Sequence, residues 1–328
     1  MSFVRYNTDD SVISSETVVR GMWTADNATL STFHTSSVVT SSYHLNVFDT
    51  ATTSSLQFSI QYGHSEGSGS ADINSSVADI TPTRINYGQY RSLIYNDENS
   101  SFNFGGIVSK DFFAINIARS RYKESIKPGS ITLKLSGSAI LELTDDSIVS
   151  GSITNFIGSN RYYNLISGSA GVAATSLAGV SGSYGLLFPD LGTIILNPRA
   201  LSAPTASGGI VLPVNQSNGS NGNNSEALYR AVSGSGASSF VLQSQETVSS
   251  RYFFTRVKNN EFNYTTNPSI INDSGSLLYT TLIDNPQTYV TTVGMYNDNN
   301  ELLAVAKLSR PLVKDFTKES LIRIKLDY

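Results

Sequence analysis

The string GHSEG, residues 63–67, has the spacing of a serine nucleophile elbow. In that motif a strand precedes the serine and a helix follows it. The strand-like LQFSIQY precedes Ser65, but SGSADINSS follows it and has no helical pattern. The hydrolase order also needs a histidine after the serine, whereas the three histidines are His34, His44 and His64. We interpret the match as a chance product of a chain rich in Ser and Gly.

Patterns for metal, phosphate or acid–base chemistry are equally weak. The histidines lack zinc-site spacing, and the absence of cysteine removes thiolate ligands, disulfides and cysteine nucleophiles. The neighbouring pairs Asp9–Asp10 and Asp145–Asp146 would point to opposite faces of a strand, which does not suit a glycosidase. GSGSAD lacks the lysine of a phosphate-binding loop. These motifs single out no catalytic, cofactor or metal site, and a glycan hydrolase built from distant carboxylates stays open as an enzymatic alternative.

The loop NDNNE, residues 297–301, offers the side-chain oxygens of Asp298, Asn300 and Glu301. It lacks the glycine and the distant bidentate glutamate of a calcium loop. Alternating apolar residues flank it, and a five-residue link is an ordinary length for a β-hairpin. We therefore predict a hairpin. The residues of its second strand predicted to share one face are Leu302, Ala304, Ala306 and Leu308.

The elements that would position these residues are mostly strands, because apolar residues alternate with polar ones between turn residues. Three segments show the period most clearly: DFFAINI with Phe113, Ile115 and Ile117, ITLKLSG with Ile131, Leu133 and Leu135, and LIRIKLDY with Ile322, Ile324 and Leu326. Amphipathic helices are scarce, with a short one expected around ALYRAV. The prediction is a mainly β fold of two or three sandwich-like or barrel-like modules with long Ser/Gly/Asn-rich loops.

Length and charge set the outer limits. The 328 residues suit about two domains, and we place borders to give regions 1–108, 109–248 and 249–328. A polar loop near 201–226, including QSNGSNGNNSE, interrupts the central region. A net charge of −4 argues against nucleic-acid binding, and no window approaches the roughly 20 apolar residues of a membrane span. The acidic N-terminus does not resemble a signal peptide, so we expect synthesis in the cytoplasm.

Three stretches resemble a known class of protein: SSRYFFTRVKNNEFNYTTNPS, IDNPQTYVTTVGMYNDNNELLAVAKLSRPLVKDFTKESLIRIKLDY and DFFAINIARSRYKESIKPGSITLKLSG. They are similar to virion structural proteins of contractile-tailed bacteriophages, including those of marine cyanobacteria. The shorter strings LTDDS and YGLLFPDLGTIILNP extend the resemblance, which covers about half of the chain, mostly beyond residue 100.

The resemblance implies a non-enzymatic component of a tail, baseplate or neck, assembled in the host cytoplasm as a homo-oligomer or ring component among other virion proteins. The candidate subunit contacts are the hairpin face and the terminal strand: Leu302, Ala304, Ala306, Leu308, Ile322, Ile324, Leu326 and Tyr328. A receptor-binding or fibre-attachment module that contacts host glycan is the alternative, since exposed Tyr and Asn loops would serve it.

Overall fold

The computed structural model describes residues 4–35, 44–51, 55–69, 81–149, 155–174, 183–216, 223–236, 238–265 and 267–327. Contacts divide the chain into two compact units: unit 1 is Met1–Glu16 with Thr247–Tyr328, and unit 2 is Thr17–Glu246. The borders fall within strands β1 (Ser11–Gly21) and β17 (Gln243–Val257). The chain is mainly β with large curled antiparallel sheets, which confirms the predicted fold class. The predicted regions are consecutive in sequence, whereas unit 1 combines both ends of the chain.

Unit 2 is built on a twelve-stranded sheet with the order β2-β16-β9-β10-β12-β14-β15-β7-β4-β3, in which β11 and β13 also pair with β12. Its strands are β2 (Thr29–Leu30), β3 (His44–Phe48), β4 (Leu56–His64), β7 (Asp111–Ile117), β9 (Thr132–Ser136), β10 (Ile140–Asp145), β11 (Asn155–Ile157), β12 (Asn160–Ser169), β13 (Val172–Ala173), β14 (Gly185–Phe188), β15 (Thr193–Leu196) and β16 (Phe240–Val241). A separate hairpin joins β5 (Phe102–Phe104) to β6 (Ile107–Ser109), and β8 (Ser125–Ile126) pairs with β17.

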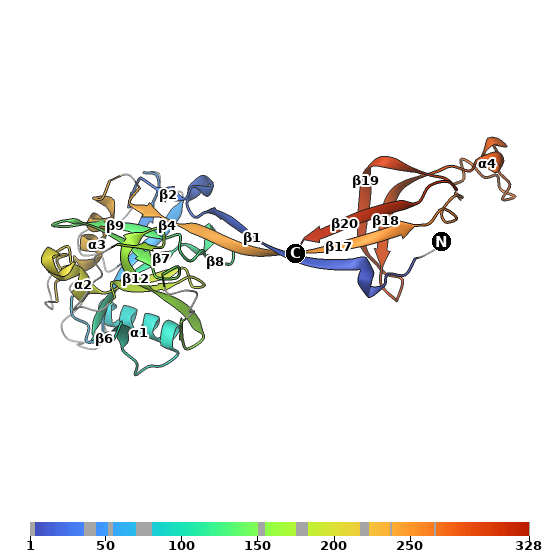
Figure 1. The fold of residues 1–328 in the computed structure, drawn as a ribbon. Coiled ribbons are helices and arrows are strands. Elements are labelled where there is room, and N and C mark those ends of the chain that lie inside the picture. The colour runs from blue at the N-terminus through green and yellow to red at the C-terminus, as the bar shows by residue number, and fades with distance from the viewer. Residues whose placement is uncertain are drawn as a thin grey trace. The chain divides into compact units, whose positions relative to one another are not determined.

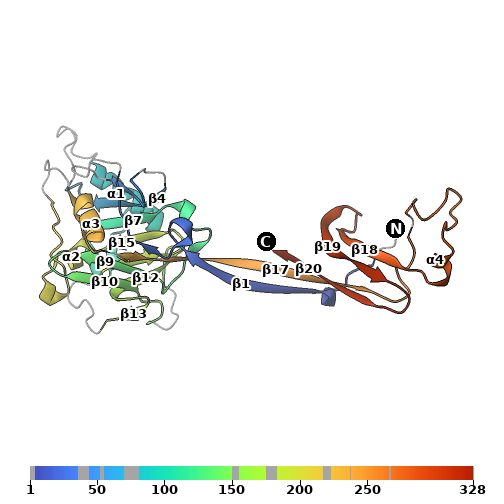
Figure 2. The same ribbon diagram turned by 90° about the horizontal axis from the view of Figure 1, so that it is seen from above.

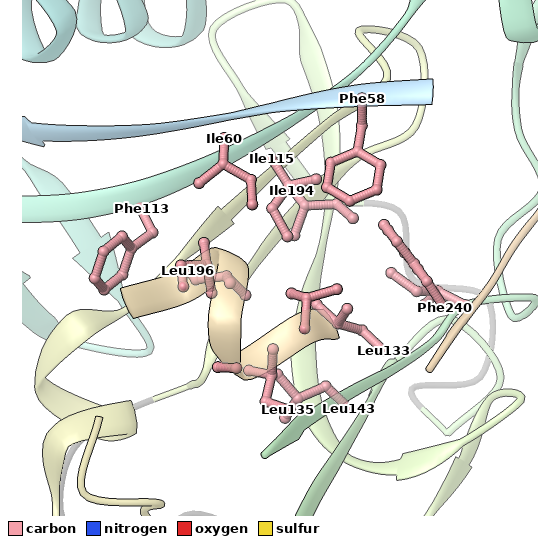
Figure 3. Packing of buried hydrophobic residues seen from close by; sticks show 14 of the residues in the cluster. Phe58, Ile60, Phe113, Ile115, Leu133, Leu135, Leu143, Ile194, Leu196 and Phe240 are labelled. Atoms are coloured by element: carbon pink, nitrogen blue, oxygen red, sulfur yellow. The ribbon is translucent and has the colours of Figure 1, made fainter. Parts of the chain in front are cut away.

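Period-two alternation sends the side chains of this sheet into two apolar clusters. In β7, Phe113, Ile115 and Ile117 enter the larger cluster, as predicted, whereas Phe112 and Ala114 enter the smaller one on the other face. In the larger cluster, side chains from β4, β7 and β15 face those from β9, β10 and β16 across the core (Figure 3). The sheet therefore curls over its own apolar face.

Helices complete unit 2. The helix α3 (Asn224–Ser233) contains the predicted ALYRAV segment and buries Leu228, Ala231 and Val232 in the larger cluster. The sequence patterns did not predict α1 (Pro82–Tyr95), drawn in cyan in Figure 1, whose Tyr87, Tyr90 and Ile94 enter the smaller cluster. The short helix α2 is Pro198–Ser202. Most of the QSNGSNGNNSE tract lies outside the described residues.

Unit 1 contains a sheet with the order β1-β17-β20 and a separate hairpin of β18 and β19, labelled in Figures 1 and 2. Its further elements are α4 (Thr281–Asp284), β18 (Thr288–Tyr296), β19 (Leu302–Lys314) and β20 (Ser320–Asp327). The strands β17 and β20 are antiparallel, with Ser250 opposite Asp327 and Val257 opposite Ser320. The terminal segment predicted as a strand is β20.

Candidate functional site

Burial of apolar side chains differs sharply between the units. Among the described residues, unit 1 buries only three large hydrophobic side chains, Val257, Ile322 and Ile324, and both apolar clusters belong to unit 2. Exposed large hydrophobic residues of unit 1 are Val4, Tyr6, Val12, Ile13, Phe262, Tyr264, Leu278, Tyr279, Ile283, Tyr289, Tyr296, Leu302, Leu303, Val305, Phe316 and Leu321. Where such exposed apolar groups form a contiguous patch, they mark an interaction surface.

The turn between β18 and β19 is held by its own backbone and by the side chain of Asn297. The backbone N–H of Asn297 donates to the carbonyl of Glu301 at 3.0 Å, which closes the hairpin. The Asn297 Oδ1 accepts from the N–H groups of Asn299 and Glu301, at 3.0 and 2.8 Å. Asn300 adopts the left-handed conformation with φ of 61°, which asparagine tolerates. The amide oxygen of Asn297 is therefore used within the turn itself.

A β-bulge changes which residues of this hairpin share a face. Met295 lies opposite Ala304, but the next pair is Tyr296 with Leu302, so Leu303 is an extra residue on β19. The bulge moves Leu302 to the face of Tyr296. A Cβ placed on Gly294 would approach both the Tyr296 ring and the Leu302 Cδ1, which agrees with that placement. The predicted common face of Leu302 with Ala304 is therefore wrong at Leu302.

The exposed face of the hairpin carries an apolar surface at its turn end. We define the hairpin patch as Tyr296, Leu302, Leu303 and Val305, whose exposed fractions are 39%, 53%, 69% and 57%. Val305 lies opposite Gly294, and the Tyr296 ring approaches the same glycine. No residue of β18 is buried, and in β19 only Lys314 is, so both faces of this two-stranded sheet are partly open. An isolated two-stranded hairpin is marginally stable in water unless something packs against it.

The other predicted contact residues fall into three groups. Ala304, Ala306 and Leu308 are half-buried on the opposite face of the hairpin, and Leu326 is half-buried on β20. Ile322 and Ile324 are only 6% and 5% exposed, because they lie opposite Thr255 and Phe253 of β17 in the same chain. These two side chains belong to the small core of unit 1 and are not available to a neighbour. Tyr328 lies outside the described residues.

Sequence reasoning missed Tyr296, Leu303 and Val305. The signal was present, since LLAVA is apolar at every position and not only at alternate ones. A strand with apolar residues on both faces is expected where both faces are covered. The even-numbered positions of this segment show only one apolar face, and the odd-numbered Leu303 and Val305 are apolar as well.

Polar contacts, rather than a large core, hold the end of the hairpin. Lys314 is fully buried, and its Nζ donates to the carbonyl of Asn259 at 2.9 Å, to the Asn263 Oδ1 at 2.8 Å and to the carbonyl of Asp315 at 2.9 Å. An ammonium group has three donors, so all three are satisfied. These bonds connect the end of β19 to the turn that follows β17.

The outward face of β20 is charged. Arg323 lies over the Tyr252 ring at 5.6 Å, and Lys325 contacts the Asp327 carboxylate at 3.0 Å. The hydrogen bond to Asp327 raises the pKa of Lys325, and the bond from the Ser250 hydroxyl, followed by that from Lys325, lowers the pKa of Asp327. The face of β20 that is not in the core therefore combines two cations with one carboxylate.

Unit 2 contains a small polar pocket of about 170 Å³. Arg20 and Lys123 both approach the Glu246 carboxylate, at 3.8 and 2.9 Å, and Arg121 and Asp26 also line the space. The Arg121 guanidinium donates to the hydroxyls of Thr24 and Ser55, at 3.2 and 2.7 Å. The pocket's charged groups thus pair largely with one another or with the surrounding chain.

The motifs that suggested catalysis have structural roles in the described chain. At the GHSEG string, β4 ends at His64 and a turn follows it, while the His64 Nδ1 accepts from the backbone N–H groups of Glu66 and Ser68. Burial lowers the pKa of His64. The neighbouring Asp111 accepts bonds from Tyr62 and Ser109, both at 2.9 Å.

The paired carboxylates Asp145 and Asp146 bind different partners. Asp145 accepts from the backbone N–H of Gly129 at 2.8 and 2.9 Å, and Asp146 accepts from the backbone and side-chain nitrogens of Asn164 at 2.9 and 3.0 Å. Burial raises the pKa of Asp145, although its hydrogen bonds oppose the shift. Both carboxylates connect strands or turns of the sheet.

Neither the remaining described residues nor known proteins point to another site. Within the described ranges, no group of three or more His, Cys, Asp or Glu residues could hold a metal ion, and no described helix has the length and apolarity to cross a membrane. No protein-family model matches the chain, and neither curated proteins nor solved structures yield a match. The exposed apolar surface of unit 1 is consequently the strongest functional feature. Its function has to be inferred from the sequence and structure of this chain.

Proposed function

We propose that this chain is a non-enzymatic structural component of a contractile-tailed bacteriophage particle, in its tail, baseplate or neck, and that unit 1 joins it to neighbouring subunits. The observation that carries the proposal is the hairpin patch on a sheet with no buried face of its own. The resemblance of the C-terminal segments to virion proteins supports the same assignment, because those segments form most of unit 1.

The energetics favour association. Four large apolar side chains, each about half exposed, would contribute roughly 3 to 6 kcal/mol on burial at about 1.5 to 3 kcal/mol for each fully buried side chain. Tyr296 suits an interface particularly well, since tyrosine adds a hydroxyl to a large apolar ring. Unit 2, with its own core, would provide the rigid body of the subunit.

A double substitution in the hairpin patch tests this function. Leu303→Lys with Val305→Lys places two charges on the patch without touching a buried side chain. The matched control is Val108→Lys in unit 2, where the replaced side chain is 61% exposed. We expect the double variant to be lost from purified particles, as measured by mass spectrometry of the particles, whereas the control is incorporated like the natural chain.

Two results would contradict the proposal. The first is absence of the natural chain from purified particles. The second is equal incorporation of the double variant and the natural chain. A particle in which the hairpin patch faces solvent at the host-binding end would instead support the receptor-binding alternative.

A further inference from the structure

The sheet of unit 1 ends in a different strand on each side. Within unit 1, β17 has neighbours on both sides, while β1 and β20 each pair with β17 alone among the described strands. The outer edge of such a strand presents unpaired N–H and C=O groups, which can accept another strand. Neither the unit 1 part of β1, SVISSE, nor β20, SLIRIKLD, contains a proline that would block pairing.

The two edge strands run in the same direction. The register of β17 with β20 is antiparallel. Along the other side of β17, Ser11 contacts Arg251, and Tyr6 contacts Thr255, so the chain entering β1 also runs opposite to β17. A rotation about an axis parallel to the strands keeps their direction. It can therefore bring β20 of one copy beside β1 of the next, as a parallel pair.

Charge disfavours pairing of β20 with itself in the registers centred near the middle of the strand. Antiparallel self-pairing centred on Ile324 places Arg323 opposite Lys325 of the second copy. Centring on Arg323 or on Lys325 places that residue opposite its own equivalent. Like charges directly opposite one another destabilise a strand pair. The charge on the unit 1 part of β1 is Glu16, which complements the basic residues of β20.

Apolar exposure follows the same two edges. Val12 and Ile13 are consecutive on β1 and so point to opposite faces of the sheet, yet both are exposed. Leu321 on β20 is also exposed. Adding a strand beside each edge would cover part of these side chains on both faces.

We infer that copies of this chain associate head to tail in unit 1, with β20 of one copy adding to β1 of the next. A foreign strand at one edge would leave the other edge open, and self-pairing of one edge would do the same. Head-to-tail addition uses both edges of each copy, and a closed ring leaves neither exposed. The inference rests on the proposed function in taking unit 1 as the associating module.

Mixing two single variants tests the arrangement. Val12→Lys adds a cation to the edge that would meet the basic β20, and Leu321→Glu adds an anion to the edge that would meet β1, whose own charge is Glu16. Each variant alone should associate at least tenfold more weakly than the natural chain in sedimentation equilibrium. An equimolar mixture should regain association, because the unaltered β20 of the first variant meets the unaltered β1 of the second. The matched control is Ile140→Lys in unit 2, where the replaced side chain is 66% exposed, as it is at Leu321.

Crosslinking provides a readout that does not depend on weakening the contact. Because the chain has no cysteine, Val12→Cys and Leu321→Cys each introduce one thiol. A short bifunctional maleimide should link the two variants when they are mixed and should link neither variant to itself. Self-linking of either variant would indicate a two-fold contact and would overturn the inference.

The inference and the proposed function fail in different ways. A natural chain that stays monomeric at every concentration measured, or a mixture that does not regain association, overturns head-to-tail pairing. Particles would still contain the chain in that case if the proposed function holds. Conversely, if the chain associates head to tail but is absent from particles, the inference holds and the proposed function fails.

Discussion

Replacing Lys314 with methionine tests whether unit 1 depends on polar contacts in place of a large core. The variant keeps a similar side-chain volume but removes an ammonium group that is fully buried and donates three hydrogen bonds. The acceptors Asn263 Oδ1 and the Asp315 carbonyl belong to buried residues, whereas Asn259 is exposed and water can replace the lost donor there.

The expected cost follows from those acceptors. Each buried acceptor left without a donor costs about 1 to 3 kcal/mol, and the charged bond to Asn259 contributes about 1 kcal/mol more once water competes. Methionine offsets part of this loss because no charge needs to be buried. The local free energy of unfolding should therefore fall by about 3 to 5 kcal/mol, a large share for a unit with so small a core.

Amide hydrogen exchange can measure this loss of stability, because peptides from each unit report the local opening of that unit. At about 1.4 kcal/mol for each factor of ten, peptides from β17, β19 and β20 should exchange roughly a hundred to several thousand times faster in Lys314→Met. Peptides of unit 2 should be unchanged. Lys307→Met, an exposed position on the same strand, is the control and should change exchange little. Equal, small effects of both substitutions would refute the reasoning.

Two predictions concern unit 2. Because burial raises the pKa of Asp145 above 3.8, the folded state binds its proton more tightly, so this group's contribution to stability decreases as pH rises from 3.8 through the folded pKa. In denaturation experiments at a series of pH values, Asp145→Asn should remove this decrease in stability. An unchanged dependence of stability on pH would contradict the raised pKa of Asp145. Phe112→Ala should cost about 3 to 5 kcal/mol, since Phe112 is fully buried against the rings of Phe102 and Tyr90. Phe156→Ala, at a 63% exposed position, is its control in the same denaturation experiment, and a similar loss for both would count against that packing.

The strands were the most predictable part of the fold. The alternation of Leu133 and Leu135 with polar residues identifies the buried face directly, and the larger cluster contains both. The helix α1 was missed although Pro82 at its first turn and the spacing of Tyr87, Tyr90 and Ile94 are helical signals. The polar residues Thr83 and Asn86 lie on the same buried face and weaken the apolar stripe, so the signal is faint.

Long-range features could not be predicted from local patterns. Unit 1 forms because β1 and β17, which are far apart in sequence, lie in one sheet. The alternation of apolar and polar residues within a strand does not indicate which other strand it pairs with. The predicted contact face of β19 differs from the observed one for a similar reason. Leu302 is apolar and alternates correctly with Ala304, but the bulge at Leu303 depends on how β19 aligns with β18.

The central claim is that the hairpin patch is covered by a neighbouring subunit in the assembled particle. The absence of cysteine from the chain makes a single thiol at Leu303→Cys a specific probe of that surface. Its rate of reaction with a small maleimide can be compared between the isolated chain and purified particles. The proposed function predicts rapid labelling of the isolated chain and strong protection in the particle. Equal labelling rates in the two states would contradict it.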